Sequence, residues 1–292
     1  MASLFGKRKA PVQDPCEGGT RPRGGCCLVL GTRGRLKAPM TLSGGAAMKP
    51  FLILQLRPET EAADEEFAAI LRRARLDRAQ VHRIRLDQEP LPPGLSLDDY
   101  AGVIVGGGPG CVSDPPEARN PTEARIEAAI LSLMPEITAR DFPFMGCCYG
   151  IGILGHHLGA PVTKAHYGEP VSPTTATRTA QGAADPLLAD LPDRFDILVG
   201  HKEALDDLPQ GCVHLLEGPR CPYQMIRHGQ NVYATQFHPE ADGQSFALRI
   251  RIYRDKGYFP PEQAESLTAA CRDVITEASG RILANFTARF GG

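Results

Sequence analysis

The stretch Phe142-Pro143-Phe144-Met145-Gly146-Cys147-Cys148-Tyr149-Gly150 decides the fold that the sequence predicts. Its first residues are apolar and suit a buried strand, and the segment from Gly150 to Gly159 has apolar residues at helical spacing. In the turn, Gly146, Cys148 and Gly150 form G-x-C-x-G, the thiol counterpart of the G-x-S-x-G nucleophile elbow. The glycines there relieve crowding around a strained residue. Because free cysteine is among the most buried residue types, a buried cysteine pair is the alternative interpretation.

The overall composition is typical of a soluble globular protein. With 292 residues, 42% of them hydrophobic and 23% charged, the chain is long enough for one large domain or two small ones. Nine cysteines are an odd number without a repeated spacing, so we expect reduced thiols in a cytoplasmic protein. No apolar run approaches about 18 residues, so no membrane span is expected.

Residues 1–48 differ from the rest of the chain. They are rich in Gly, Arg and Pro and have no amphipathic period, so we expect a disordered basic extension. Their net charge is +6, against -8 for the remainder, and this acidic body argues against a nucleic-acid partner. Two interpretations of the extension stay open, namely a basic arm that binds RNA or an anionic partner, and a segment without function.

The part that begins at residue 51 predicts a parallel sheet. Residues 51–56 are a continuous apolar run, typical of a strand buried on both faces. A helix is expected from Thr60, with acidic residues early and arginines late, followed by strands at 81–86 and 102–105. Strand, helix and strand at this spacing predict βαβ units.

A glycine cluster, Gly106-Gly107-Gly108-Pro109-Gly110, directly follows the third of these strands. It offers exposed backbone N–H groups at the carboxyl edge of the sheet, where ligands bind. A dinucleotide or phosphate loop is the alternative, but the spacing is not G-x-G-x-x-G and no G-K-[ST] follows. Asn120, Pro121 and Glu123 then form a capping signature that opens the helix leading to Phe142.

Beyond Gly159 short strands replace the helical pattern. They are expected at 171–176, 195–199, 213–216, 223–226 and 231–237, of which the last two form a hairpin. A helical extension is expected at about 244–292, with helices at 245–255, 263–272 and 280–290. Leu283, Phe286 and Phe290 form an apolar stripe that should pack the last helix on the sheet.

The hairpin ends in Gln236-Phe237-His238-Pro239-Glu240, a second candidate for chemistry. His238 follows a strand end, so its ring reaches over the same sheet edge as Cys148, and Glu240 can orient the imidazole. A helix N-terminus and a nearby imidazole lower a thiol pKa, which favours Cys148 as a nucleophile. Alone, His-x-Glu is typical of a surface pair. Together with the elbow and the glycine cluster it indicates a triad, with Cys148 Sγ within about 4 Å of a His238 ring nitrogen.

Three blocks, residues 104–110, 146–150 and 234–240, together resemble the class I, or triad, glutamine amidotransferases, the family typified by the glutaminase domain of GMP synthase. They match the family's oxyanion loop, nucleophile elbow and His/Glu signature, in that order. The resemblance spans about residues 50–243. It implies an α/β fold, a flavodoxin-like three-layer α/β/α sandwich with a mostly parallel central sheet, and one amidotransferase domain over residues 49–292 that includes the helical extension.

The resemblance also implies a mechanism. Cys148 would attack the side-chain carboxamide of glutamine, His238 would pass the proton to the departing ammonia, and Glu240 would hold His238. The backbone N–H groups of Gly108 and Tyr149 would stabilise the oxyanion by about 3 kcal/mol each. Only Cys148, and not its neighbour Cys147, has glycine at both i-2 and i+2.

The sequence departs from the family pattern at Gly152, where the family usually has a substrate-contacting glutamine. The segment His166-Tyr167-Gly168 resembles the family's substrate-wall loop, and Gly200-His201 resembles the segment that meets the amino-acid head group. Gly168 and Gly200 have an alternative interpretation as simple turn residues. The residues expected around the substrate are Gly110, Gly152, Tyr167, Gly168, Gly200 and His201.

Three hypotheses about function follow. The first is a glutaminase that releases ammonia from glutamine for a synthetase partner on another chain. The second is a hydrolase of a γ-glutamyl compound with the same triad, which the loss of the family glutamine at Gly152 favours. The third is a catalytically idle member that binds a metabolite or partner. No cofactor is expected, and no metal, because His156-His157 has no acidic or thiol partner at ligand spacing.

Overall fold

The structure is a computed structural model that describes residues 48–292, so the extension expected at residues 1–48 lies, apart from Met48, outside the described residues. The helices are α1 (Thr60–Ala74), α2 (Pro121–Ala139), α3 (Tyr149–His157), α4 (Ala180–Ala183), α5 (Gly243–Tyr253), α6 (Ala264–Arg272) and α7 (Glu277–Phe290). The strands are β1 (Phe51–Gln55), β2 (Val81–Arg85), β3 (Gly102–Val105), β4 (Phe144–Cys147), β5 (Val162–Thr163), β6 (Glu169–Arg178), β7 (Arg194–His201), β8 (Ala204–Leu205), β9 (Cys212–Glu217), β10 (Met225–His228) and β11 (Val232–Thr235). Single 3₁₀ turns lie at Arg78–Gln80, Leu97–Asp99, Pro116–Ala118 and Pro261–Gln263.

Nine of the strands form one sheet in the order β2-β1-β3-β4-β11-β10-β9-β6-β7. The first five are parallel, with Phe144 of β4 opposite Val103 of β3 and Val232 of β11. The remaining four continue the sheet in antiparallel fashion, starting with the β10–β11 hairpin. The prediction of an α/β sandwich is confirmed, and the sheet is mixed with a parallel core because hairpins replace the βαβ connections after β6.

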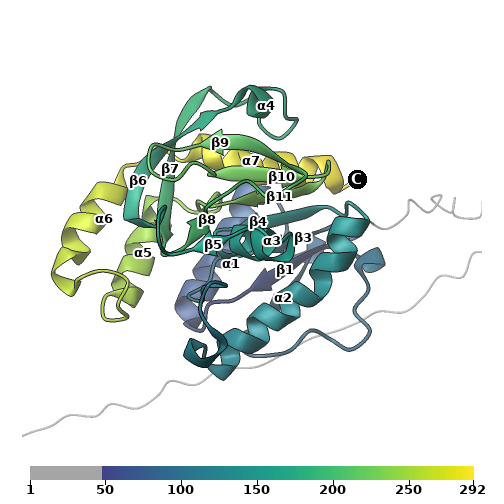
Figure 1. Ribbon diagram of the computed structural model, residues 1–292, viewed down its shortest axis with the longest axis horizontal. Coiled ribbons are helices and arrows are strands. Elements are labelled where there is room, and N and C mark those ends of the chain that lie inside the picture. The colour runs from purple at the N-terminus through teal and green to yellow at the C-terminus, as the bar shows by residue number, and fades with distance from the viewer. Residues whose placement is uncertain (1–47) are drawn as a thin grey trace, which may run out of the picture. The chain divides into compact units, whose positions relative to one another are not determined.

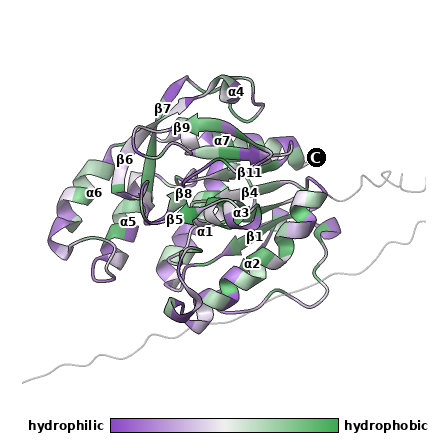
Figure 2. Ribbon diagram, in the orientation of Figure 1, coloured by the Kyte–Doolittle hydropathy of each residue, from purple (hydrophilic) through white to green (hydrophobic). Residues whose placement is uncertain are grey.

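Helices cover both faces of the parallel core (Figure 1). On one face, Ile130 of α2 and Ile153 of α3 pack in a core with Val103 and Val105. On the other face, α1 and α7 form a second core in which Phe286 is fully buried. Figure 2 shows the corresponding concentration of hydrophobic residues on the central strands. This three-layer arrangement places the carboxyl ends of β1, β3 and β4 side by side, because parallel strands end at the same edge.

Local signals explain where the long helices begin and pack. Asn120 Oδ1 accepts hydrogen bonds from the N–H groups of Thr122 and Glu123, and Glu123 reaches back to the Asn120 N–H, so the predicted capping box is confirmed. The predicted docking of the last helix is also confirmed, since Leu283 and Phe286 are fully buried in the second core.

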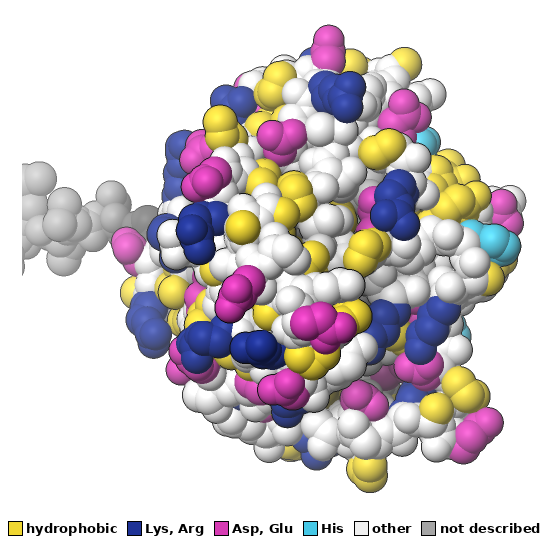
Figure 3. Space-filling model, turned by 90° about the vertical axis from the view of Figure 1, so that its left-hand side faces the viewer, with side chains coloured by type: hydrophobic (Ala, Val, Ile, Leu, Met, Phe, Trp, Pro, Cys, Tyr) yellow, Lys and Arg dark blue, Asp and Glu magenta, His cyan; other side chains and the backbone are white. Residues whose placement is uncertain are grey.

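A third, smaller core lies beside β6 and β7, at the left of Figure 1. It joins Leu198 of β7 to Phe246 and Ile250 of α5 and to Cys271 of α6. Helices α5 and α6 of the helical extension therefore pack against the antiparallel part of the sheet, and α5 lines a pocket with Cys148 of the elbow. On this side of the molecule, shown in Figure 3, acidic and basic side chains are interspersed without a large patch of one sign.

Two strands that the sequence did not predict, β5 and β8, pair with each other in a separate two-stranded sheet. Each has only two residues, so neither carries an alternating pattern that sequence reasoning can detect. Among the helices of the described residues, none has the length and apolar character needed to cross a membrane.

Candidate active site

The elbow has the strained geometry that G-x-C-x-G predicts. Cys148 lies between the end of β4 and the start of α3, and its backbone has φ 56° and ψ -88°, a conformation that residues with a side chain rarely adopt. Gly146 is required there, because a Cβ on it would lie 2.9 Å from Cα of Gly150. The turn therefore holds Cys148 at the carboxyl edge of the sheet.

The two neighbouring cysteines have different surroundings. Cys147 is fully buried in the core on the α1 and α7 face, and burial raises the pKa of its thiol well above the ordinary value. Cys148 is 9% exposed and lines a pocket, together with His238. The alternative of a buried cysteine pair thus describes Cys147 and does not describe Cys148.

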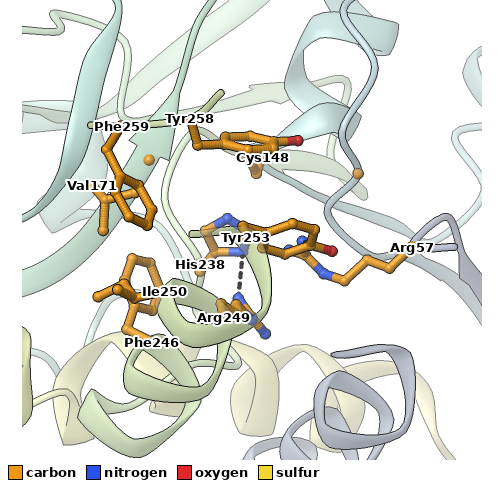
Figure 4. A pocket seen from close by; sticks show the side chains of 12 residues that line it. Arg57, Cys148, Val171, His238, Phe246, Arg249, Ile250, Tyr253, Tyr258 and Phe259 are labelled. Atoms are coloured by element: carbon orange, nitrogen blue, oxygen red, sulfur yellow. Dashed lines mark hydrogen bonds between the residues drawn. The ribbon is translucent and has the colours of Figure 1, made fainter. Parts of the chain in front are cut away.

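His238, which lies in this pocket (Figure 4), forms a buried pair with Glu240. Nδ1 of His238 lies 2.8 Å from Oε1 of Glu240, whose side chain has no exposed surface. Within residues 48–292 no hydrogen bond joins the Cys148 thiol to the His238 ring, although both line the pocket. The short separation expected between Sγ and the ring stays a prediction.

Arg249 of α5 is a third charged member of this group, which sequence reasoning missed. Its Nη2 lies 3.0 Å from Glu240 Oε1 and its Nη1 lies 3.2 Å from His238 Nδ1. A guanidinium only donates hydrogen bonds and a carboxylate only accepts them. Nδ1 of His238 can therefore either donate to Glu240 or accept from Arg249, but it cannot do both. Donation from Nδ1–H to Glu240 matches the closer, charge-assisted contact and leaves Nε2 as the basic nitrogen of the ring.

The charges of the group set its protonation. Burial opposes ionisation of Glu240, but attraction to His238 and Arg249 outweighs it and lowers the pKa of this carboxyl well below its ordinary value. The pKa of His238 is lowered by burial; Glu240 offsets part of this effect, and Arg249 and Arg57 add smaller decreases. His238 is therefore a neutral base beside a carboxylate at neutral pH.

The thiol itself is protonated in the free site. Burial raises the pKa of Cys148 to about 12, although the nearby Arg57 acts in the opposite direction. The expectation of a lowered thiol pKa was wrong, because the loss of solvation outweighs the attraction of the thiolate to Arg57. A thiolate at Cys148 would therefore require a general base that takes the thiol proton.

Arg57 lies under the glycine cluster and was also missed. It forms a buried ion pair of 2.8 Å with Glu66, which accepts a further hydrogen bond from the Gly107 N–H. A Cβ on Gly107 would lie 2.6 Å from His238 Cε1 and 2.8 Å from Arg57 Nη2, so the loop passes between these two side chains. The available signal was a charged residue placed directly after a fully buried strand at the ligand-binding edge.

The two N–H groups expected to form the oxyanion hole have no protein acceptor among the described residues, so each can donate a hydrogen bond to a ligand. Within the described residues, neither the Gly108 N–H nor the Tyr149 N–H donates to a backbone or side-chain acceptor. Tyr149 is the first residue of α3, where the helix leaves its N–H groups unpaired. Gly108 packs so closely on Leu56 that a Cβ would approach to 2.9 Å.

Gly152, where the sequence departs from the family pattern, has no room for a side chain. Glu203 occupies that space, since a Cβ on Gly152 would lie 2.9 Å from Oε1 of Glu203. This buried carboxylate accepts hydrogen bonds from the N–H groups of Val112 and Ser113 and from the Ser113 hydroxyl. Sequence reasoning missed Glu203, which comes from a different part of the chain and lies against Gly152.

The other residues expected around the substrate fall into two groups. Gly110, Gly200 and His201 line a second pocket with Cys148, together with Lys202 and Glu203. Gly168 instead packs on the backbone of Lys202, and Tyr167 contacts His166 and lines neither pocket.

A cluster of Glu169, His201 and Cys221 lies beside this second pocket, with one potential ligand atom of each within 4.8 Å of the others. These groups already have protein partners, since His201 contacts both Glu169 Oε2 and the Glu203 carbonyl. Gln224 donates to the same Glu169 oxygen, and burial raises the pKa of Cys221 to about 12. No sequence motif indicates this cluster, because its members lie far apart in the chain.

An α/β sheet with a strained cysteine at its carboxyl edge and a buried His–Glu pair beside it is typical of the triad amidotransferases, and comparison with known proteins gives the same class. Residues 62–250 match the family model described as "Glutamine amidotransferase class-I", and the chain belongs to this family. The resemblance inferred from the three sequence blocks is thereby confirmed.

Curated relatives and solved structures agree with this assignment. The chain is 30% identical over 186 residues to GMP synthase [glutamine-hydrolyzing] of Thermomicrobium roseum, and 26% identical over 185 residues to that of Neisseria meningitidis. These matches cover 62% and 60% of this chain but 31% and 32% of the relatives, so the chain spans about a third of their length. Crystal structures of glutamine amidotransferases from Thermotoga maritima and Methylobacillus flagellatus share the fold, with TM-scores of 0.64 and 0.61 at 20% identity. The alignments cover 83% and 84% of this chain and 98% and 94% of those chains.

The protonation states predict the pH dependence of any turnover at this site. Because the pKa of His238 is lowered from its ordinary 6.5, kcat/KM should stay level through pH 6.5 and fall only at lower pH, where the imidazolium cannot take the thiol proton. Because the thiol pKa is raised, no increase is expected from about pH 7 to about pH 9. A steady-state pH profile checks both limbs, and an increase centred near pH 8.5, the ordinary thiol value, would contradict them.

The Gly152 and Glu203 contact predicts a coupled effect on stability. Gly152→Ala should lower the free energy of unfolding by about 1–3 kcal/mol, because the new methyl group collides with Glu203. In a Glu203→Ala background the same change should cost much less, which a double-mutant cycle in urea measures. Gly150→Ala is the matched control, since its Cβ would find Val105 at an uncrowded 3.9 Å. Equal costs of Gly152→Ala in both backgrounds would refute the contact.

Proposed function

We propose that this chain hydrolyses the γ-carboxamide of glutamine by thiol catalysis and releases glutamate and ammonia. The observation that carries the proposal is the strained Cys148 in one pocket with His238, whose ring is paired with Glu240. The unpaired N–H groups of Gly108 and Tyr149 beside it support the proposal.

The chemistry has two halves. Nε2 of His238 takes the thiol proton while Cys148 Sγ attacks the γ-carbonyl carbon, and the resulting oxyanion accepts hydrogen bonds from Gly108 and Tyr149. The C–N bond then breaks, and the ammonia leaves with the proton held on His238. A water molecule, deprotonated by the same ring, attacks the thioester, so that glutamate departs and the thiol is restored.

The fate of the ammonia is part of the proposal. Curated relatives are named GMP synthase, and the matched region covers about a third of their length. We therefore propose that a synthetase on another chain receives the ammonia, and that the reaction takes place in the reducing cytoplasm, as the cysteine content led us to expect.

The test is direct. The purified protein is incubated with glutamine, alone and with an extract that supplies a synthetase, and glutamate is measured. Glutamate formation in either condition supports the proposal. Absence of glutamate in both, together with absence of labelling of Cys148 by a glutamine-analogue electrophile, would indicate the catalytically idle alternative.

A further inference from the structure

Two pockets meet at Cys148 and have different linings. One contains Cys148 and His238, and the other contains Cys148, Tyr149 and the polar residues Lys202 and Glu203. The two pockets share Cys148, Gly108 and Gly200, and Tyr258 lies between them. A substrate bonded to Cys148 therefore has a different environment on either side of the carbonyl carbon.

The chemistry of the triad assigns the two sides. His238 protonates the leaving group, so the leaving group lies in the pocket that contains His238. The γ-glutamyl part then lies in the other pocket, where Lys202 and Glu203 offer charges of both signs to an amino-acid head group. This assignment of the two pockets rests on the proposed function.

The leaving-group side is larger than ammonia requires. Its cavity volume is about 50 Å³, whereas a molecule of the size of water or ammonia needs roughly 10–15 Å³ on the same measure. Its walls are mainly apolar and aromatic, and most of them come from the helical extension (Figure 4). The apolar and aromatic lining residues are Val171, Phe246, Ile250, Tyr253, Tyr258 and Phe259.

The charges in this pocket select against a cationic leaving group. Arg57 and Arg249 line it, and no Asp or Glu among the described residues does. Each guanidinium is already paired, Arg57 with Glu66 and Arg249 with Glu240, so neither calls for an anionic ligand. An uncharged apolar group fits both the walls and these two cations.

We propose that the same site, besides hydrolysing glutamine, takes γ-glutamyl amides of uncharged, apolar primary amines, such as N-alkyl or N-benzyl glutamines, at a higher kcat/KM. The steps are those already described, except that the C–N bond broken joins the γ-carbon to a substituted nitrogen. The proton taken from Cys148 leaves on the amine, and water regenerates the thiol and releases glutamate. Burial of the alkyl group against Val171, Ile250 and Phe259 strengthens binding on the side where the bond breaks.

The test compares glutamate release from a substrate series. The series consists of glutamine, γ-glutamyl methylamide, γ-glutamyl n-butylamide, γ-glutamyl benzylamide and γ-glutamyl 4-aminobutylamide. We expect kcat/KM for the butylamide to exceed that for glutamine by roughly tenfold or more, since apolar groups fill the pocket. The 4-aminobutylamide, which has the same chain with a terminal ammonium, should be at least roughly tenfold poorer than the butylamide.

Two variants locate the preference in this pocket. Val171→Trp fills it, so the ratio of butylamide to glutamine kcat/KM should fall roughly tenfold. The same substitution at Val213, which lies on β9 and outside both pockets, is the matched control and should preserve the ratio. Phe259→Ala, a change on a partly exposed segment, removes one wall and should also reduce the ratio.

The contrary results separate this inference from the proposed function. Hydrolysis of glutamine at a kcat/KM equal to or above that of every alkyl amide would overturn the inference and leave the glutaminase proposal standing. No glutamate from any substrate, with no labelling of Cys148, would overturn the glutaminase proposal itself. An unchanged ratio in both folded pocket variants would also overturn the assignment of the leaving-group side.

Discussion

Cys148→Ala is expected to abolish glutamate release, lowering kcat/KM by about 10³-fold or more, because no other group at the elbow can form the thioester. The substitution removes only a sulfur atom from a site that is 9% exposed, so the fold should persist. Glutamate release under single-turnover and steady-state conditions measures the loss.

The adjacent cysteine provides the matched control for this prediction. Cys147 lies one residue away but is fully buried on the opposite face, so Cys147→Ala should cost roughly 1 kcal/mol of stability and retain most of the turnover. Turnover at the wild-type rate by Cys148→Ala, or complete loss of turnover in a folded Cys147→Ala variant, would contradict the assignment of Cys148 as the nucleophile.

Glu240→Gln is expected to have the second largest effect. It removes the carboxylate that holds Nδ1 of His238 and leaves Arg249 beside an uncharged amide. We expect kcat/KM to fall by about 10²- to 10⁴-fold, as for other triads that lose the orienting acid. The free energy of unfolding should fall by about 3 kcal/mol, because the buried guanidinium loses its closest counter-charge.

Glu65→Gln is the control that separates these two effects. Glu65 is the other carboxylate near Arg249, at 3.6 Å, and none of its described contacts is to His238. We expect a small loss of stability and nearly unchanged turnover from this change. If Glu240→Gln lowered turnover no more than Glu65→Gln does, Glu240 would have no orienting role.

The parts of the fold that sequence could predict are those with a repeating local signal. The apolar run at 51–56, the capping box at Asn120 and the crowded Gly146 each appear in the structure as expected. The crowding expected at Gly150 was a wrong prediction, since a Cβ there would find Val105 at 3.9 Å. Each signal depends on neighbours in sequence, so a short window contains all of it. Strands β5 and β8 could not be predicted in this way, because a strand of two residues is recognised only by its pairing with a partner that is distant in sequence.

The same distinction applies to the site. Sequence reasoning identified Cys148, His238 and Glu240 because they belong to short motifs that follow one another in the order typical of the family. Arg249 and Glu203 act through single charged side chains whose partners lie on other elements, so only the folded arrangement reveals them. The thiol pKa was mispredicted for a related reason, since burial, which raises it, is a property of the packed site and not of the local sequence.

The central claim is that Cys148 is the nucleophile for a γ-glutamyl carbonyl. The most direct measurement is mass spectrometry of the protein after treatment with an electrophilic glutamine analogue, with and without excess glutamine. The account predicts one covalent adduct, located on Cys148, formed more slowly when glutamine is present and absent from Cys148→Ala. An adduct on another cysteine, or a rate on Cys148 that neither glutamine nor a γ-glutamyl alkyl amide reduces, would contradict it.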